Sequence, residues 1–325
     1  MKAWTWDRYG SPDVLTLRDM DEPEIARDEV LVRMRAASVN PYDWRHVRAD
    51  PHLVRMSAGL RRPKAGLILG ADLAGVVERV GDDVTGLRPG DEVFGEVPLG
   101  AFAEAVGVSQ ETLAVKPTDL PFERAAAVSM AAQTALQGLR DAGRISAGQR
   151  VLINGASGGI GTFAVQLAKA LGAEVTGVCS TRNLELVRSL GADDTVDYTR
   201  EDFTERSPRY DLLMDIVGNR SLADLRRVLK PHGTLVLVGG IAAGGRLLGP
   251  MAQVLRGALA SHIVSHRIVS VRWKPNARDL RFLAGLIEAE KVVPVIDRTY
   301  PFVEVPEALR YLEQRHARGK VVITG

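Results

Sequence analysis

The stretch "NGASGGIG", residues 154–161, has the glycine spacing of a loop that binds a dinucleotide. It follows the apolar run "RVLI" and precedes "TFAVQLAKALGA", which has the composition of a helix. Its glycines permit a tight turn and let the backbone approach a pyrophosphate. We expect the amides that donate to that anion to come from Ser157, Gly158, Gly159 and Ile160. The alternative is a glycine-rich turn without a ligand, which the alternating strands and helices around it disfavour.

The residues after the next apolar run bear on the choice between NAD and NADP. That run, "EVTGVC" (174–179), is followed by Ser180, Thr181 and Arg182. NAD-binding folds usually carry an acidic residue here, which holds the ribose diol. Two hydroxyls and a guanidinium instead suit a 2′-phosphate, so the sequence predicts NADPH as the cofactor. The alternative interpretation makes "STRN" a helix cap with a solvated arginine.

Six apolar runs that alternate with helical segments predict a doubly wound parallel sheet over residues 122–274. The runs are rich in Val, Ile and Leu, which is typical of strands buried on both faces. They cover residues 150–155, 174–179, 195–198, 211–218, 234–240 and 267–273. We expect helices over 122–139, about 160–171, 183–191 and 221–233.

The first 121 residues predict a β-rich unit, a partly open barrel. Its Val-rich runs have Gly, Pro or Asp at their ends and cover residues 29–39, 75–81, 91–97 and 101–108. The tail from Pro275 reads as a long helix, a strand near 292–297, a helix at 305–314 and a strand at 320–324. It is too short to fold alone. We therefore expect an α/β protein with one domain from 1–121 and 275–325 and a second from 122–274.

Composition places the chain among ordinary globular proteins. A length of 325 residues favours two domains. The net charge of +2 gives no general attraction to nucleic acid or membrane. One cysteine, Cys179, excludes a disulfide framework and a multi-cysteine zinc site. The N-terminus has no apolar core like that of a signal peptide, and no apolar run approaches the ~20 residues that span a bilayer. We expect a cytoplasmic protein.

The glycine loop fits two enzyme classes, the short-chain dehydrogenases (G-x-x-x-G-x-G) and the medium-chain reductases (A-x-x-G-x-x-G). Short-chain enzymes carry the loop close to the N-terminus and use a Tyr-x-x-x-Lys pair as the catalytic base. Here the loop begins at residue 154, and none of the six tyrosines has a lysine four residues on. Tyr311, with Arg315, comes nearest. The short-chain interpretation therefore fails.

Over nearly its whole length the chain resembles the zinc-independent medium-chain reductases of the quinone oxidoreductase (zeta-crystallin-like) type. The resemblance implies a GroES-like catalytic domain and a Rossmann cofactor domain. It rests on "AASVNPYDW" (36–44), "LGADLAGVVERVG" (69–81), "GDEVFG" (90–95), "QTALQGL" (133–139), residues 154–173, "SLGADDTVDY" (189–198), "IDRTYPFVEVPEAL" (296–309) and "GKVV" (319–322).

The resemblance also implies that no catalytic metal is bound. Zinc dehydrogenases of this superfamily hold the metal with Cys, His and Cys, and the matching positions here are Asn40, Ala71 and Met130. None is a credible zinc ligand. Without a Lewis acid, the protein is poorly equipped to oxidise alcohols. Hydride transfer from NADPH to a quinone or a conjugated carbonyl needs no metal, because conjugation moves the developing charge onto oxygen.

By alignment to the family, Asn40 lies near the nicotinamide ribose and the substrate, and Tyr42 is the expected donor to the enolate oxygen. Each role has an alternative. Water could supply the proton, Asn40 could serve only as a turn former before Pro41, and Tyr42 could pack in the domain interface with its hydroxyl merely satisfied. Asp43 is interpreted as a structural hydrogen-bond partner. The same alignment adds cofactor contacts from Tyr198 at the 2′-phosphate, Thr134, the backbone of Val238, Gly239 and Gly240, and Lys320. The strand at 267–273 matches one that pairs across the dimer in relatives, which favours a homodimer.

Two segments should shape the substrate pocket. Residues 45–67 carry six Arg or Lys against one acid, Asp50. They fit either an anionic or carrier-bound substrate or, as charge runs more often do, a solvated mobile loop. Residues 239–262 are apolar and glycine-rich, which suits a pocket wall or ordinary core packing.

The sequence thus predicts a zinc-independent, NADPH-dependent reductase of quinones or α,β-unsaturated carbonyls. Three alternatives stay open: a reductase of unactivated carbonyls, a biosynthetic enoyl reductase with a specialised substrate, and an NADPH-binding structural or regulatory protein without turnover.

Overall fold

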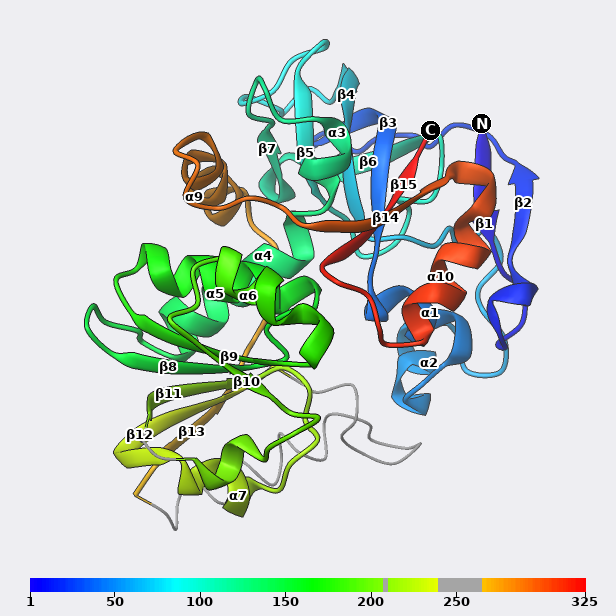
Figure 1. Cartoon of the computed structure of the whole chain (residues 1–325). Helices are drawn as coiled ribbons and strands as arrows, with labels where there is room; N and C mark the ends of the chain where they lie inside the picture. Colours follow the sequence, from blue (N-terminus) through cyan, green and yellow to red (C-terminus); the bar gives the residue numbers. More distant parts are fainter. Residues whose placement is uncertain (207–209, 239–264) are drawn as a thin grey trace. The chain divides into compact units, whose positions relative to one another are not determined.

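The computed structural model describes residues 1–206, 210–238 and 265–325, and the chain divides into two compact units (Figure 1). The first unit holds residues 1–133, 275–289 and 294–325, and the second holds residues 134–274 and 290–293. The border between them falls after Gln133, twelve residues beyond the expected end of the first domain at 121. Helix α3 (Phe122–Ala126) accounts for part of this difference, because it packs on strands of the first unit.

The first unit is built on a mixed seven-stranded sheet whose centre is β3 (Glu29–Val39). The strand order is β14 (Ile296–Pro301), β15 (Lys320–Thr324), β3, β4 (Asp72–Val80), β5 (Glu92–Glu96) and β7 (Leu113–Val115), with β6 (Ala105–Ser109) also paired to β3. A separate hairpin joins β1 (Lys2–Thr5) to β2 (Thr16–Asp19). Because β15 pairs antiparallel with β3, the last strand of the chain is part of this sheet.

Runs of consecutive buried apolar residues explain this sheet, since Val30, Leu31 and Val32 of β3 are all buried and both faces of that strand are therefore covered. Its buried cluster includes Val30, Val32, Leu73, Val77 and Val93. The remaining helices of the unit are α1 (Pro41–Arg48), α2 (Arg55–Ala58), the first part of α4 (Ser129–Gln137), α9 (Ala277–Glu288) and α10 (Val305–Glu313).

The second unit has a six-stranded sheet in which every neighbouring pair is parallel, and this confirms the predicted doubly wound fold. The strand order is β10 (Asp194–Asp197), β9 (Glu174–Cys179), β8 (Arg150–Asn154), β11 (Tyr210–Asp215), β12 (Leu229–Leu237) and β13 (Arg267–Ser270). The ligand crevice of such a sheet lies at the carboxyl ends of its strands. The site residues of this unit are therefore expected there.

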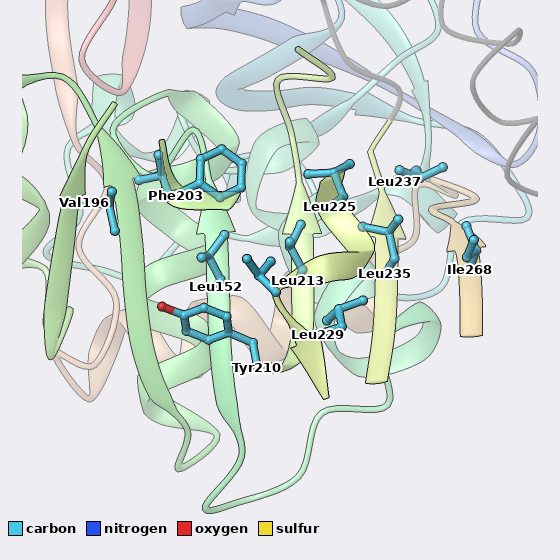
Figure 2. Packing of buried hydrophobic residues seen from close by; sticks show 12 residues of the cluster. Leu152, Val196, Phe203, Tyr210, Leu213, Leu225, Leu229, Leu235, Leu237 and Ile268 are labelled. Carbon is cyan, nitrogen blue, oxygen red and sulfur yellow. The ribbon is translucent and has the colours of Figure 1, made fainter. Parts of the chain in front are cut away.

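In the described part of this unit, helices α5 (Gly159–Ala170), α6 (Leu184–Ser189) and α7 (Leu222–Arg227) pack on the sheet, and a π-helical turn spans Gly138–Ala142. Figure 2 shows part of the core, in which Leu152, Leu213 and Leu235 of neighbouring strands lie with Phe203 and Leu225. All five side chains are buried, so the sheet is fixed by apolar packing on this face.

Several predicted elements differ from the structure. The helix expected over 122–139 is divided into α3 and α4, and the strand expected at 101–108 begins only at Ala105. The helix expected over 221–233 ends at Arg227, and β12 begins at Leu229. Leu229 pairs with Tyr210, a bulge that contains His232 at φ +64° follows, and regular pairing resumes at Thr234. Proline at 231 and glycine at 233 do not suit a helix interior, which explains the early end.

The strand expected near 292–297 starts later, at Ile296. The amide and carbonyl of Val293 bond instead to the side chain of Gln166 on α5. Pro294 also has no N–H to give to a sheet.

The segment 45–67 is not a plain loop. It contains the end of α1, a short 3₁₀ turn at His52–Val54 and α2. Arg48 pairs with Glu313 of α10, and the guanidinium of Arg55 lies 4.9 Å from the ring centre of Tyr9.

No helix within the described ranges is long and apolar enough to cross a membrane.

Candidate functional site

The glycine loop of the second unit connects β8 to α5. The amides of Gly155 and Ala156 both donate to the carbonyl of Val178 on β9, and Gly155 adopts φ +93°. A Cβ at Gly161 would lie 2.0 Å from the carbonyl oxygen of Gly155, so this position requires glycine. The chain thus turns tightly from strand to helix, with Gly158 as the residue that caps α5.

This geometry fits the pyrophosphate of a dinucleotide. Gly159 and Ile160 open α5, so their amides have no partner within the helix. The helix dipole favours an anion at the same place. The side chain of Ser157 is half-buried directly before the cap. The residues present could therefore hold the cofactor phosphates in the way that the sequence predicts.

The end of β9 carries no acidic side chain. Ser180 follows Cys179 and is half-buried, and a 3₁₀ turn (Thr181–Asn183) leads into α6. Arg182 is exposed, and the side chain of Tyr198 after β10 is half exposed, at 50%. These positions leave a 2′-phosphate without a carboxylate from β9 to repel it.

Thr181 is engaged differently from its neighbours. Its hydroxyl donates to Oδ2 of Asp197 at 2.5 Å and lies 3.0 Å from the hydroxyl of Thr199. The hydrogen bond from Thr181 holds the pKa of Asp197 below its usual value. A phosphate contact through the hydroxyl hydrogen of Thr181 would compete with this bond.

Asn183 is a residue that sequence reasoning missed. Its amide nitrogen donates to the hydroxyl oxygen of Ser157 at 2.9 Å and to that of Ser180 at 3.3 Å. It therefore connects the glycine loop to the loop after β9. Its place as the last letter of "STRN" gave no sign of this role, because the contact with Ser157 spans 26 residues.

The other predicted cofactor residues of this unit are only partly described. Thr134 is buried, and Val238 donates its amide to the carbonyl of Asp215 at the end of β11. Gly239 and Gly240 lie outside the described residues, as does the whole of the predicted pocket segment 239–262. Their contacts with a cofactor stay predictions.

A buried polar cluster in the first unit is centred on Asp72. Oδ2 of Asp72 accepts hydrogen bonds from the hydroxyl of Ser38 at 2.7 Å, from the amide of Asn40 at 2.9 Å and from the ammonium of Lys320 at 3.0 Å. Oδ1 accepts from the backbone amide of Met130, near the start of α4, at 2.9 Å. A carboxylate can be kept in the interior when it accepts this many donors.

Strand register explains why these residues meet. Ser38 pairs directly with Asp72 across β3 and β4, and Val39 pairs with Val321 across β3 and β15. The next pair along β3 and β15 would join Asn40 to Lys320. The ammonium of Lys320 does donate to Oδ1 of Asn40, at 2.5 Å.

These contacts use almost all of the hydrogen-bonding capacity of the Asn40 side-chain amide. Its nitrogen donates to Asp72 and, more weakly, to the carbonyl of Ser38 at 3.4 Å. Its oxygen accepts from Lys320 and keeps one further lone pair. The structure thus brings together two predicted site residues, Asn40 and Lys320, and adds two that were not predicted, Asp72 and Ser38.

Asp43 closes the turn from β3 into α1. Its Oδ2 accepts from the backbone amide of Asn40 at 2.6 Å, which is the carboxylate half of a capping box. Its Oδ1 is buried and has no hydrogen-bond partner among the described residues. Burial raises the pKa of Asp43 to about 8, and the nearby charge of Asp72 adds to that effect.

Tyr42 lies on α1, next to Asp43, and is half-buried. Its ring centre is 4.2 Å from that of His46, whose Nδ1 is 2.9 Å from the carbonyl oxygen of Tyr42. Burial raises the pKa of Tyr42 to about 12, and the charges of Asp43 and Glu96 act in the same direction. The phenol therefore stays protonated at neutral pH and can donate a hydrogen bond.

The three positions that match zinc ligands all adjoin Asp72. Asn40 donates to it through its side chain, Ala71 precedes it in the chain, and Met130 donates to it through the backbone. Among the residues that the structure describes, no three His, Cys, Asp or Glu side chains gather as they would around a metal ion. The cation recorded at this point of the fold is the ammonium of Lys320.

Two family models match parts of the chain. Residues 26–121 match the alcohol dehydrogenase GroES-like domain, and residues 190–323 match a domain described as zinc-binding dehydrogenase. Both domains come from one superfamily, which supports the predicted resemblance.

Three similar proteins span nearly the whole chain. A 2-methylene-furan-3-one reductase of Solanum lycopersicum is 36% identical over 99% of this chain and 79% of its own length. An NADPH-dependent alkenal/one oxidoreductase, chloroplastic, of Arabidopsis thaliana is 35% identical over the same shares of both chains. The solved structure of a quinone oxidoreductase from Coxiella burnetii has a TM-score of 0.85 and is 32% identical, over 100% of this chain and 99% of its own.

Proposed function

The chain belongs to the medium-chain dehydrogenase/reductase superfamily, and on that premise we propose that it is an NADPH-dependent reductase of quinones or α,β-unsaturated carbonyls that works without zinc. The names of its relatives support the reaction class, since they include an enone reductase, an alkenal/one oxidoreductase and a quinone oxidoreductase.

The observation that carries the proposal is the set of residues at the three zinc-ligand positions. Asparagine, alanine and methionine at positions 40, 71 and 130 do not form a zinc site, and Asp72 of the Asp72–Lys320 ion pair adjoins all three. A reductase without a Lewis acid needs an acceptor that spreads the developing charge by conjugation. Quinones and enones are acceptors of this kind.

NADPH supplies the hydride, and the residues of the chain bind, orient and donate hydrogen bonds. Ser157 and the amides of Gly159 and Ile160 suit the pyrophosphate, and Ser180 and Arg182 suit the 2′-phosphate. The phenol of Tyr42 is the proposed donor to the enolate oxygen. Because its pKa is raised to about 12, we assign it the role of hydrogen-bond donor and assign delivery of the proton to water.

The assembly and the location of the protein are also proposals. Among the strands of the described ranges, β13 is at the edge of the six-stranded sheet, and a homodimer through paired β13 strands is consistent with that place. Size-exclusion chromatography with light scattering would test the dimer. The predicted cytoplasmic location stays a prediction, and the Arabidopsis relative bears the word chloroplastic in its name.

The experiment is NADPH oxidation, followed by absorbance, against a benzoquinone, a naphthoquinone, an alkyl enone, a 2-alkenal and a saturated ketone. Each acceptor is run with EDTA and, as a cofactor control, with NADH. We expect the conjugated acceptors alone to react, at rates that EDTA does not change, and slower turnover with NADH. Tight NADPH binding without oxidation by any acceptor would instead favour an NADPH-binding protein. Reduction of the saturated ketone alone would contradict the proposal.

A further inference from the structure

Asn183 occupies a buried position between the two loops that we assign to the phosphates of NADPH. Its side chain is almost fully enclosed, with only 4% of the residue exposed. Ser157, before α5, and Ser180, after β9, are each half-buried, so each keeps a face that a ligand can reach. The Asn183 amide nitrogen lies within hydrogen-bond distance of both hydroxyl oxygens.

The direction of these hydrogen bonds determines what the two serines offer. A hydroxyl has one hydrogen to donate and can accept at its oxygen. Because Asn183 donates to both oxygens, neither serine spends its hydrogen on Asn183. Both hydroxyl hydrogens are therefore available to an acceptor, and phosphate oxygens are strong acceptors.

The opposite amide orientation is disfavoured by the surroundings. As placed, the amide oxygen of Asn183 is the buried atom that has no hydrogen-bond partner among the described residues. Exchange of the oxygen and nitrogen would leave two amide hydrogens buried without an acceptor, where one unpaired oxygen stands now. Two unpaired donors cost more than one unpaired acceptor.

We propose that Asn183 is a positioning residue for NADPH, which turns the hydroxyl hydrogens of Ser157 and Ser180 toward the pyrophosphate and the 2′-phosphate, respectively. This inference rests on the proposed use of NADPH. It links the two phosphate sites through one side chain, so loss of Asn183 affects NADPH through both serines and NADH through Ser157 alone.

The test is the dissociation constant of the purified chain for NADPH, NADH and 2′,5′-ADP, measured by fluorescence or calorimetry. For Asn183→Ala we expect about tenfold weaker binding of NADPH, the value of roughly one charge-assisted hydrogen bond, and a smaller loss for NADH. Asn183→Asp keeps the shape but can only accept from the serines, so it should weaken NADPH binding more than the alanine variant does. Ser189→Ala removes an exposed hydroxyl from α6 and should leave all three constants unchanged.

A double-mutant cycle distinguishes positioning from a structural role. In a chain that already carries Ser157→Ala and Ser180→Ala, the change Asn183→Ala should have almost no further effect on NADPH affinity. The same loss in both backgrounds would overturn the inference, as would wild-type affinity in Asn183→Asp. If Asn183→Ala fails to fold, Asn183→Asp carries the test, because it preserves shape. Absence of NADPH binding by the wild-type chain would overturn the proposed function itself, and this inference with it.

Discussion

The ammonium of Lys320 lies 3.0 Å from Oδ2 of Asp72, and the two side chains are only 4% and 0% exposed. This ion pair is therefore part of the interior of the first unit. Three uncharged donors, from Ser38, Asn40 and Met130, complete the shell of the carboxylate. The pair fixes the amide of Asn40 between an anion and a cation.

Removal of the cation should destabilise the first unit strongly. In Lys320→Met, Asp72 loses its buried charged partner, and we expect a loss of about 3–5 kcal/mol in the free energy of unfolding. Urea denaturation followed by circular dichroism measures this. The double variant Asp72→Asn with Lys320→Met removes both charges and should be more stable than Lys320→Met alone. Equal stability of Lys320→Met and the wild-type chain would contradict the buried ion pair.

Asp43 should make stability depend on pH in a direction opposite to most carboxylates. Burial raises its pKa from 3.8 to about 8 in the folded chain, so between these values the folded state binds more protons than the unfolded state. Its contribution is present at low pH and is lost as the pH rises toward 8, with a slope of up to about 1.4 kcal/mol per pH unit.

The matched variant for this effect is Asp43→Asn, which imitates the protonated acid and can still accept from the amide of Asn40. Between pH 5 and 8 its free energy of unfolding should fall less steeply than that of the wild-type chain. Parallel curves for the two proteins, measured by urea titration at each pH, would show that Asp43 does not titrate in this range.

Tyr42→Phe should lower kcat with an alkyl enone by roughly tenfold to a hundredfold, since it removes one donor to the developing charge. Because burial raises the pKa of Tyr42 to about 12, the ratio of wild-type to variant kcat should be constant between pH 6 and 9. Tyr300→Phe, in the same unit, serves as the control and should behave as wild type. A ratio that changes sharply within this pH range would assign a proton-transfer role to Tyr42 instead.

Ser180→Asp should weaken the preference for NADPH over NADH. It places a carboxylate after β9, where it would repel a 2′-phosphate, and we expect about tenfold or greater loss of NADPH affinity. NADH affinity should change little, because its ribose diol can donate to the new acid. Ser180→Ala controls for loss of the hydroxyl. Unchanged discrimination between the two cofactors would place the 2′-phosphate elsewhere.

Much of the fold could be predicted because its signals are local. Continuous runs such as 174–179 mark parallel strands, and β9 has the predicted bounds. One error has a local cause, since Pro231 and Gly233 do not suit the helix expected over 221–233. Another arises where a distant residue decides. The amide of Val293 donates to the side chain of Gln166, and the carbonyl of Val293 accepts from it. The two residues are 127 positions apart, and no local pattern in 292–297 reveals that contact.

The candidate site, too, was predicted where the signal is local and missed where distant residues meet. The glycine loop and the absent acid after β9 follow from short stretches of sequence, whereas Asn40 and Lys320 were identified only through resemblance. Their contact spans 280 residues and depends on the register of β15 against β3. Asp72, at the centre of the cluster, was missed because its partners Ser38, Asn40 and Lys320 lie 34, 32 and 248 residues away in the sequence.

The most direct measurement is the position of the transferred hydrogen in the product of an alkyl enone. The enone is reduced with NADPH that carries deuterium at the transferred position, in the presence of EDTA, and the product is analysed by NMR. We predict a saturated ketone with deuterium on the β-carbon. An allylic alcohol with deuterium on the carbinol carbon, or a reaction that EDTA stops and zinc restores, would contradict zinc-independent reduction of the conjugated double bond.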